Sequence, residues 1–373
     1  MQQSKPQPYT PESPPMYSSN DDIDFREFFK ALWDGKLLII LVTALFTATS
    51  MGFALVAQEW WSSKAKISAP QPQNIAAYQQ QVRQFQPVFN TYQDDGTFLV
   101  SKELDSLVNY NNLFDDFINT FNSANNKRDF LDKSSEFQEF KSTLTANGAD
   151  MTVDEVRVLY AEWFARISAF VVDSKDRNSP YLLSFQTTSK ESSFDLLTSY
   201  ILETEAKVHE DAFNNLQALV KGKRHELIQQ RILLESQAKN QLLVETERAQ
   251  YAAQIAKSAG VEKPIQAWNE NELFSIDLGV KGLEAKVQAL KSVKNLSVIE
   301  PRLQQIEAKL DMLNNLEIDR TVDFQTFRFL GSVEQPTSRD KPKRALIVLF
   351  GAFIGGLFGA GIVLIRFAFR KED

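Results

Sequence analysis

The chain has 373 residues, no cysteine, two histidines and a formal net charge of −7. Without cysteine there is no disulfide scaffold, no thiol nucleophile and no cysteine-ligated zinc. The acidic balance argues against nucleic acid as a partner, because little cationic surface remains to neutralise a phosphate backbone. Hydrophobic residues make up 43% of the chain, which is too many for a disordered protein.

The first 36 residues precede any long apolar run. Residues 1–20 combine prolines with Gln and Ser, a composition typical of a disordered polar tail. Phe25 to Leu32 forms a short amphipathic stretch that leads into Trp33, which suits a membrane interface. We therefore predict that residues 1–36 form a disordered tail and an interfacial segment.

Two apolar runs, Leu37 to Ala57 and Ala345 to Ile365, contain no charged residue. As helices each would reach about 30 Å, the thickness of the hydrocarbon core of a bilayer. The first run is too long for a cleaved signal peptide, so it is interpreted as an uncleaved anchor. Two spans place residues 1–36 and 366–373 in one compartment and residues 58–344 in the other. Lysines and arginines balance across the flanks, so their count does not decide the orientation.

Both predicted spans carry small residues at a spacing of four, which places them on one face of each helix. Such faces allow two helix backbones to approach closely within a bilayer, where hydrophobicity no longer drives association. The residues assigned to this packing role are Gly351, Gly355, Gly356, Gly359, Ala44, Ala48 and Gly52.

The middle of the chain mixes strand and helix patterns, which predicts an α+β base from residues 58–189 and 317–344. Alternating apolar residues predict strands at 63–69, 181–188 and 322–329, the last with one slip in its alternation. The first and last strands adjoin the two spans, so the small mixed sheet is expected close to the membrane. Apolar residues at spacings of three and four predict packed helices, including 104–121 and 153–170.

Residues 190–259 contain no proline and a single glycine, Gly222. Their composition favours one helix of about 105 Å. Its apolar residues form one narrow stripe, so the helix is expected to project and pack along a thin seam rather than serve a compact core. Gly260 stands where a left-handed cap is expected. Residues 281–316 would return alongside it, interrupted at Pro301, to complete a hairpin over 190–316 with its tip near 260–280.

The sequence contains no pattern that supports catalysis. It lacks a phosphate-binding GxxxxGK[ST] loop, and His225-Glu226 is not followed by a histidine at the spacing of zinc proteases. The carboxylates are scattered along predicted exposed helices. We therefore predict no catalytic residue, no metal site and no cofactor.

Three segments together resemble a known family. Residues 23–36 contain the run Leu32-Trp33-Asp34-Gly35-Lys36, Pro336 to Arg370 contains RDKPKRAL and GGLFGAGIVL, and Ile255 to Pro264 is followed by FSIDL. This order is similar to that of the O-antigen chain-length determinants, or Wzz-type polysaccharide co-polymerases, and within them to the FepE-like branch that gives very long chains. The matching span-entry residues are Pro336, Pro342, Lys343, Trp33, Gly35 and Lys36.

The resemblance implies an inner-membrane protein with both termini in the cytoplasm and its main domain in the periplasm. It implies rings of about eight to nine protomers, a closed head-to-tail assembly, that act with the O-antigen polymerase to set polysaccharide length without being enzymes. The small-residue faces are then candidates for polymerase contact as well as for packing. Further partners implied are undecaprenyl-linked polysaccharide and membrane lipid.

Two other functions stay open at this point. A periplasmic adaptor of a secretion or efflux system also uses a long helical hairpin, but it usually has one span or a lipid anchor together with additional strands. A kinase-linked exopolysaccharide co-polymerase would need a separate kinase partner, because few residues follow the second predicted span.

Overall fold

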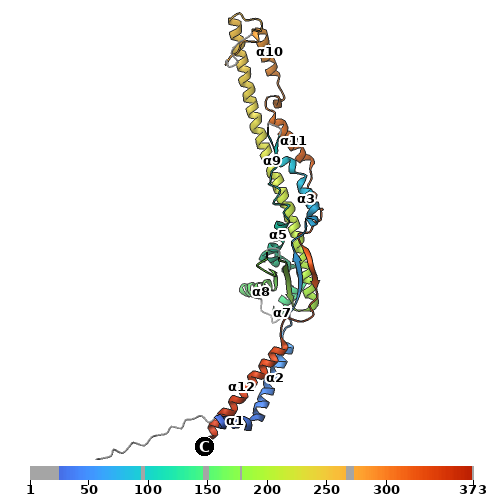
Figure 1. The fold of residues 1–373 in the computed structure, drawn as a ribbon, viewed down its shortest axis with the longest axis vertical. Coiled ribbons are helices and arrows are strands. Elements are labelled where there is room, and N and C mark those ends of the chain that lie inside the picture. The colour runs from blue at the N-terminus through green and yellow to red at the C-terminus, as the bar shows by residue number, and fades with distance from the viewer. Residues whose placement is uncertain (1–24, 94–96, 146–150, 177–178, 266–272, 372–373) are drawn as a thin grey trace, which may run out of the picture. The chain divides into compact units, whose positions relative to one another are not determined.

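The computed structural model describes residues 25–93, 97–145, 151–176, 179–265 and 273–371. The chain divides into two compact units, one of residues 1–61 and 338–373 and one of residues 62–337. The predicted tail over residues 1–20 lies outside the described residues. Figure 1 shows the elements in chain order.

The first unit holds three helices, α1 (Phe25–Asp34), α2 (Lys36–Val56) and α12 (Arg344–Lys371). Both α2 and α12 are long and apolar enough to cross a membrane, so the structure has a candidate span at each predicted place. Helix α12 continues past Ile365, the predicted end of the second span, because nothing after that residue breaks a helix.

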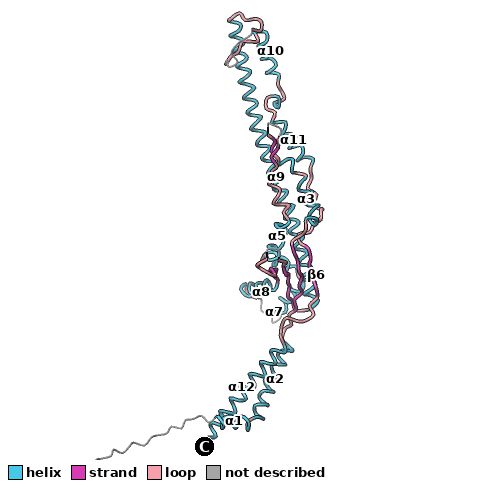
Figure 2. The backbone as a smooth tube through the Cα atoms, viewed as in Figure 1, coloured by secondary structure: helices cyan, strands magenta, loops and turns pink. Residues whose placement is uncertain are grey.

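A four-stranded sheet organises one end of the second unit, in the order β4 (Ile167–Val171), β5 (Tyr181–Thr187), β1 (Trp61–Ser68) and β6 (Arg328–Glu334). Strands β1 and β6 pair antiparallel, with Ile67 opposite Phe329. The strands that follow the first span and precede the second are therefore neighbours (Figure 2), as the sequence predicted.

Three predicted elements were wrong in their bounds. The last strand is β6, not 322–329, because Phe324 and Phe327 are buried from an irregular segment instead of alternating along a ladder. The helix predicted over 153–170 ends at Arg166, since Ile167–Val171 pairs with β5 as strand β4. The helix predicted over 104–121 begins only at Tyr110.

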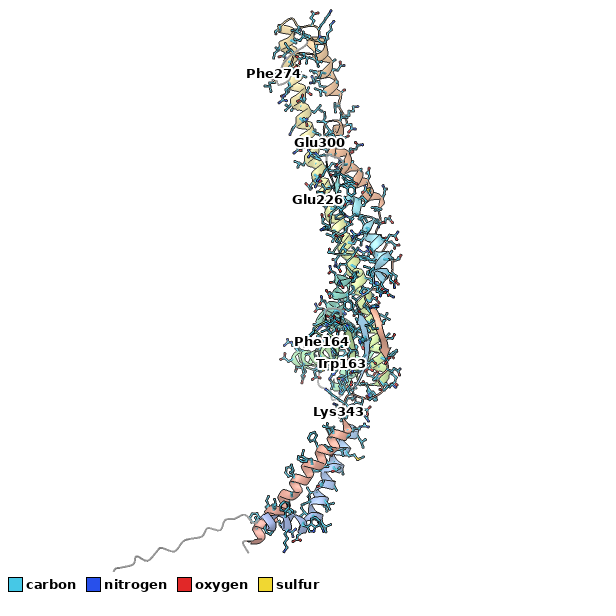
Figure 3. All side chains as sticks on the ribbon, in the orientation of Figure 1. Trp163, Phe164, Glu226, Phe274, Glu300 and Lys343 are labelled. Carbon is cyan, nitrogen blue, oxygen red and sulfur yellow. The ribbon has the colours of Figure 1, made fainter. Side chains whose placement is uncertain are left out.

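The aromatic residues of the base pack into a core of buried side chains against the sheet. Helices α5 (Tyr110–Asn122), α6 (Ala124–Lys133), α7 (Ser135–Thr145) and α8 (Val153–Arg166) surround it. Trp163, labelled in Figure 3, is fully buried there and meets Phe137 edge to face at 5.1 Å between ring centroids. Lys127 donates to the carbonyl of Ile167 at 2.7 Å, which caps the end of α8. Burial lowers the pKa of Lys127.

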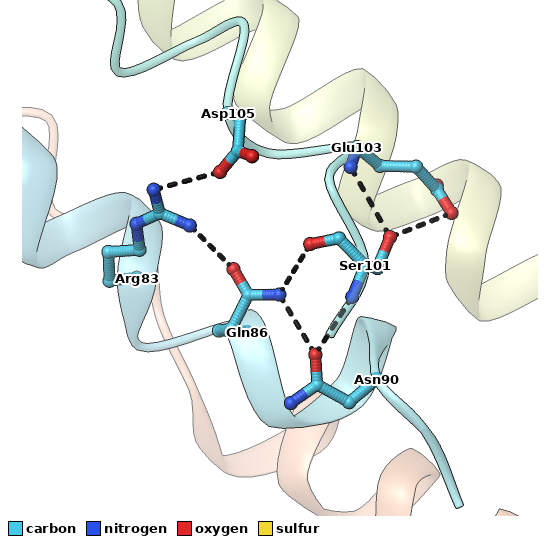
Figure 4. A network of polar contacts seen from close by, with 6 residues as sticks. All are labelled: Arg83, Gln86, Asn90, Ser101, Glu103 and Asp105. Atoms are coloured by element: carbon cyan, nitrogen blue, oxygen red, sulfur yellow. Dashed lines mark hydrogen bonds and ion pairs between the residues drawn. The ribbon is translucent and has the colours of Figure 1, made fainter. Parts of the chain in front are cut away.

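Residues 72–89 pack against the middle of the long helix, and residues 91–92 and 98–99 pair in a small two-stranded sheet that the sequence did not predict. They form η1 (Pro72–Ile75), α3 (Ala76–Arg83), α4 (Gln86–Phe89), β2 (Thr91–Tyr92) and β3 (Phe98–Leu99). Figure 4 shows how polar side chains hold the hairpin: Gln86 Nε2 donates to Asn90 Oδ1 and to the Ser101 carbonyl, both at 2.9 Å, and Arg83 reaches Asp105 at 2.8 Å.

The long helix predicted over 190–259 is confirmed as α9 (Lys190–Ser258). Gly260 has φ +71 and follows the helix as expected, and the amide of Val261 donates to the Ala256 carbonyl at 2.9 Å. Helices α10 (Gly279–Ser292) and α11 (Arg302–Asn315) run back alongside α9, with η2 (Leu296–Val298) between them (Figure 1). The interruption predicted at Pro301 is confirmed, because this residue is the N-cap of α11. Residues 266–272 of the predicted tip lie outside the described residues.

The expectation that this helix serves no compact core was wrong for its first half. Leu197, Tyr200 and Ile201 are buried in the core of the base, together with the sheet and α5. Leu216 and Leu227 belong to a second core, which also contains residues from α3, α4 and α11. Only the last turns of α9 form the thin seam that was expected, because their buried residues against α10 are small, such as Ala252 and Ala256.

The segment between α11 and β6, residues 316–327, is here called the strap, and it crosses α9. Its Phe324 is 2% exposed and lies between two rings, Tyr78 at 4.5 Å and His209 of α9 at 4.1 Å between centroids. Asn74 Nδ2 donates to Gln325 Oε1 at 2.6 Å. These contacts join the strap to α3 and α9.

The strap makes the stability of the domain depend on pH through His209. Burial lowers the pKa of His209 below its ordinary value of 6.5, and neighbouring Asp323 and a backbone hydrogen bond at Phe324 only partly offset it. Below pH 6.5 the unfolded chain therefore binds this proton more readily, and stability is lost as pH falls through the folded pKa. Burial raises the pKa of Glu205, which acts in the opposite sense.

We expect His209→Gln to lose less stability on acidification than the wild type, because its side chain cannot become a buried cation. Chemical unfolding of both proteins across the neutral to mildly acidic range measures the difference, and Glu205 is present in both. Parallel pH dependence of the two proteins would contradict the assignment.

Candidate functional site

The glycine face of α12 lies against α2. A Cβ on Gly355 would lie 2.8 Å from Phe46 Cβ and 2.9 Å from Thr43 Cα, and one on Gly359 would lie 2.9 Å from Ile39 Cα. Gly351 is equally tight, against Ser50. Real side chains do not fit at these distances, so glycine is what permits the two backbones to come this close.

The other small residues assigned from the sequence do not share this contact. Gly356 has only Thr43 Oγ1 at 3.8 Å from a would-be Cβ, which is ordinary contact. Ala44, Ala48 and Gly52 of α2 are exposed, and Gly52 has no neighbour within 4 Å. The structure therefore uses the face of Gly351, Gly355 and Gly359 within this chain and leaves the small-residue face of α2 open.

The hydroxyl side chains of α2 are compatible with this packing because they donate hydrogen bonds to backbone carbonyls of the same helix. Thr43 Oγ1 donates to the Ile39 carbonyl at 2.8 Å and Thr47 Oγ1 to the Thr43 carbonyl at 2.7 Å. Ser50 donates to the Thr47 carbonyl at 3.0 Å. No hydroxyl of these three needs water or another helix, which is the condition for threonine and serine in hydrocarbon.

The span-entry residues divide between two places. Gly35 joins α1 to α2 and is packed so closely on Val363 of α12 that a side chain would collide. Trp33 is exposed, with Lys36 Nζ 4.9 Å from its ring centroid. Pro342 and Lys343 lie at the start of α12, where the Lys343 carbonyl accepts the amides of Leu346 and Ile347. Pro336 follows β6.

A charged cluster that the sequence analysis missed joins the other ends of α2 and α12. Glu59 Oε1 accepts from Arg339 at 2.5 Å and from Arg344 at 2.8 Å. Arg344 Nε also donates to the Ala54 carbonyl at 2.9 Å, near the C-terminal end of α2. The amide of Trp60 donates to the Lys341 carbonyl at 3.0 Å. The sequence did contain a signal for this cluster: Glu59 stands just after the first span, and Arg339 and Arg344 stand just before the second.

We expect Glu59→Gln to destabilise the helix pair, because Arg339 and Arg344 would then face each other without an anion. The side chains are about one-third exposed, so the loss should be about 1–2 kcal/mol. Thermal unfolding of the detergent-solubilised protein measures it. Lys341→Gln, which changes an exposed side chain in the same loop, is the control. Equal melting of the two variants would mean that the cluster does not hold the helices.

The described residues offer no arrangement of His, Asp and Glu side chains that could hold a metal ion. His225, one of the two histidines of the chain, lies on α9, and the other stacks on Phe324.

Comparison with known proteins agrees with this arrangement. The family described as "Wzz: Chain length determinant protein" matches residues 21–111. The ferric enterobactin transport protein FepE of Escherichia coli (strain K12) is 26% identical and covers 97% of this chain and 94% of its own. The chain length determinant protein of the same strain is 25% identical over 95% of each chain. A solved full-length bacterial polysaccharide co-polymerase covers 95% of this chain and 99% of its own, with 23% identity and a TM-score of 0.60.

The fold and the packed pair of candidate membrane helices define a class of protein in which two spans flank a mostly helical domain built on one very long helix. The chain matches the Wzz chain length determinant family over residues 21–111 and is similar, along 95% or more of its length, to the two relatives from Escherichia coli. The family resemblance inferred from the three sequence segments is thereby confirmed.

Proposed function

We propose that this protein sets the modal chain length of lipopolysaccharide O-antigen as an oligomeric co-polymerase that acts with the O-antigen polymerase. The observation that carries the proposal is the extent of the likeness. It covers 95% of this chain and 95% of a relative named chain length determinant protein, and the fold matches a full-length polysaccharide co-polymerase over 95% of this chain.

In this proposal the protein acts by positioning its helices and its neighbouring copies, and not by catalysing a reaction. Its glycine-packed helices would hold one end of the domain at the bilayer, and its long helix would stand beside those of neighbouring copies. Large apolar side chains on the outer part of α9 are exposed, including Leu233, Leu243 and Val244. Exposed apolar stripes of this kind favour contact with further copies in a head-to-tail ring. The ring size of about eight to nine protomers stays a prediction of the resemblance.

The open face of Ala44, Ala48 and Gly52 is the better candidate for contact with the polymerase. The glycine face of α12 is already covered by α2, whereas small residues on an exposed face of a membrane helix invite a second helix. Contact with an undecaprenyl-linked polysaccharide would occur on the same side of the membrane as the large domain.

The proposed location is the bacterial inner membrane, with both termini in the cytoplasm and the large domain in the periplasm. Alkaline phosphatase fused after residue 373 should be inactive, and the same enzyme inserted directly after Asp176, which is exposed, should be active. The reverse result would contradict the orientation. Extraction of the protein by carbonate would contradict the spans.

Deletion of the gene tests the function. The strain should still make O-antigen, but its lipopolysaccharide ladder should lose the preferred length, and plasmid expression of the chain should restore it. An unchanged ladder would refute the proposal. The likeness over both spans favours neither a periplasmic adaptor nor a kinase-linked exopolysaccharide co-polymerase, the two alternatives.

A further inference from the structure

The end of the α9–α10 pair farthest from the sheet contains an open hollow of about 700 Å³. Phe274, labelled in Figure 3, lines it together with residues of the last turns of α9. The described residues that line the hollow are Tyr251, Gln254, Ile255, Ser258, Ala259 and Phe274.

Backbone contacts hold this end of the molecule in one conformation. The amide of Val280 donates to the Val261 carbonyl at 3.0 Å, and the amide of Ile265 donates to the Asp277 carbonyl at 2.9 Å. Gly279 has φ +63, and a Cβ there would lie 2.8 Å from the backbone of Lys263. The two walls of the hollow are thus joined independently of any ligand, which lowers the entropy lost on binding.

The lining combines an aromatic surface with uncharged polar groups. Tyr251 is 53% exposed and meets Phe274 edge to face, with 5.7 Å between ring centroids. Gln254 and Ser258 follow Tyr251 at three and seven residues along α9, so they stand on the same face of the helix. Gln254 is exposed, with its amide available to donate and accept.

These groups suit a neutral sugar better than an anion or a lipid. A pyranose ring presents C–H groups on one face, which pack on an aromatic ring, and hydroxyls at its rim, which pair with amide and hydroxyl groups. A phosphate would require a cation, and none of the described lining residues is charged. An acyl chain would cover the exposed amide of Gln254 without offering it a hydrogen-bond partner.

We propose that this hollow is a binding subsite for one or two sugar residues of the polysaccharide whose length the protein regulates. The identity of the glycan rests on the proposed function, whereas the inference that a sugar binds here rests on the residues that line the hollow. Tyr251 is the residue on which a sugar ring stacks, and Gln254 and Ser258 orient its hydroxyls. The subsite would engage the polymer at the end of the domain opposite to the sheet.

Binding of water-soluble O-polysaccharide, released from the host strain by mild acid, to the full-length protein in nanodiscs tests the proposal. Saturation-transfer NMR and calorimetry should show saturable binding. Tyr251→Ala should weaken it about tenfold, whereas Tyr251→Phe, which keeps the ring, should stay within about twofold. Leu202→Ala, which changes an exposed apolar residue 49 positions before Tyr251 on the same helix, should bind as the wild type does.

Several outcomes would overturn the subsite. These are no saturable binding, equal binding by Tyr251→Ala and the wild type, or equal weakening by Leu202→Ala. A change of oligomer size in Tyr251→Ala with glycan affinity unchanged would assign the hollow to contact between copies instead. If only the subsite is wrong, the lipopolysaccharide ladder of the deletion strain should still lose its preferred length. If the proposed function is wrong, that ladder should be unchanged, so the two failures are distinguishable.

Discussion

Gly355→Leu should disrupt the preferred O-antigen length while leaving the protein in the membrane. The new side chain would begin with a Cβ 2.8 Å from Phe46 Cβ and 2.9 Å from the backbone of Thr43. The backbone of Thr43 cannot move aside without shifting α2, so the two helices must separate. Lipopolysaccharide gels of a deletion strain that expresses the variant measure the effect, and immunoblots of membrane fractions confirm expression.

Gly361→Leu provides the matched control on the same helix. No atom lies within 4 Å of a Cβ at Gly361, so leucine there adds apolar surface without displacing α2. Its ladder should resemble the wild type. A wild-type ladder for Gly355→Leu would show that the close approach of the helices does not matter for length control, and identical defects in both variants would assign the effect to added bulk alone.

Phe324→Ala should destabilise the large domain by about 3–5 kcal/mol, the range for removing a buried aromatic ring. Phe324 is 2% exposed and contacts Tyr78, His209 and Phe213, with centroids 4.5, 4.1 and 6.0 Å away. Its loss would leave a cavity at the crossing of the strap over α9. Guanidinium unfolding followed by circular dichroism measures the change.

Phe329→Ala removes the same ring from a neighbouring position of the chain. Phe329 lies on β6 and is 45% exposed, so we expect a loss of about 1 kcal/mol or less. If the two variants unfolded at the same denaturant concentration, the strap would not be the element that joins α3 and α9.

Helix α9 illustrates what local sequence can predict and where local patterns fail. Its bounds follow from a run without proline, and its end follows from Gly260, because both signals act within a turn of the chain. Strand β6 was misplaced by six residues, because Val322 and Phe324 have the spacing of strand residues, whereas Phe324 and Phe327 are in fact buried by partners distant in sequence. The hairpin of β2 and β3 is held by side chains of α3 and α4, which no strand pattern shows.

The sequence alone determined the two candidate spans, the long helix with its cap, and the small residues that allow helices to approach, because hydrophobic length, helix propensity and glycine spacing are local properties. Only the tertiary structure decided that Gly351, Gly355 and Gly359 contact α2 while Ala44, Ala48 and Gly52 stay open. It also brought Glu59 to Arg339 and Arg344 and Tyr251 to Phe274. Those pairings depend on how distant segments pack, and the periodicity of one segment does not specify its partner.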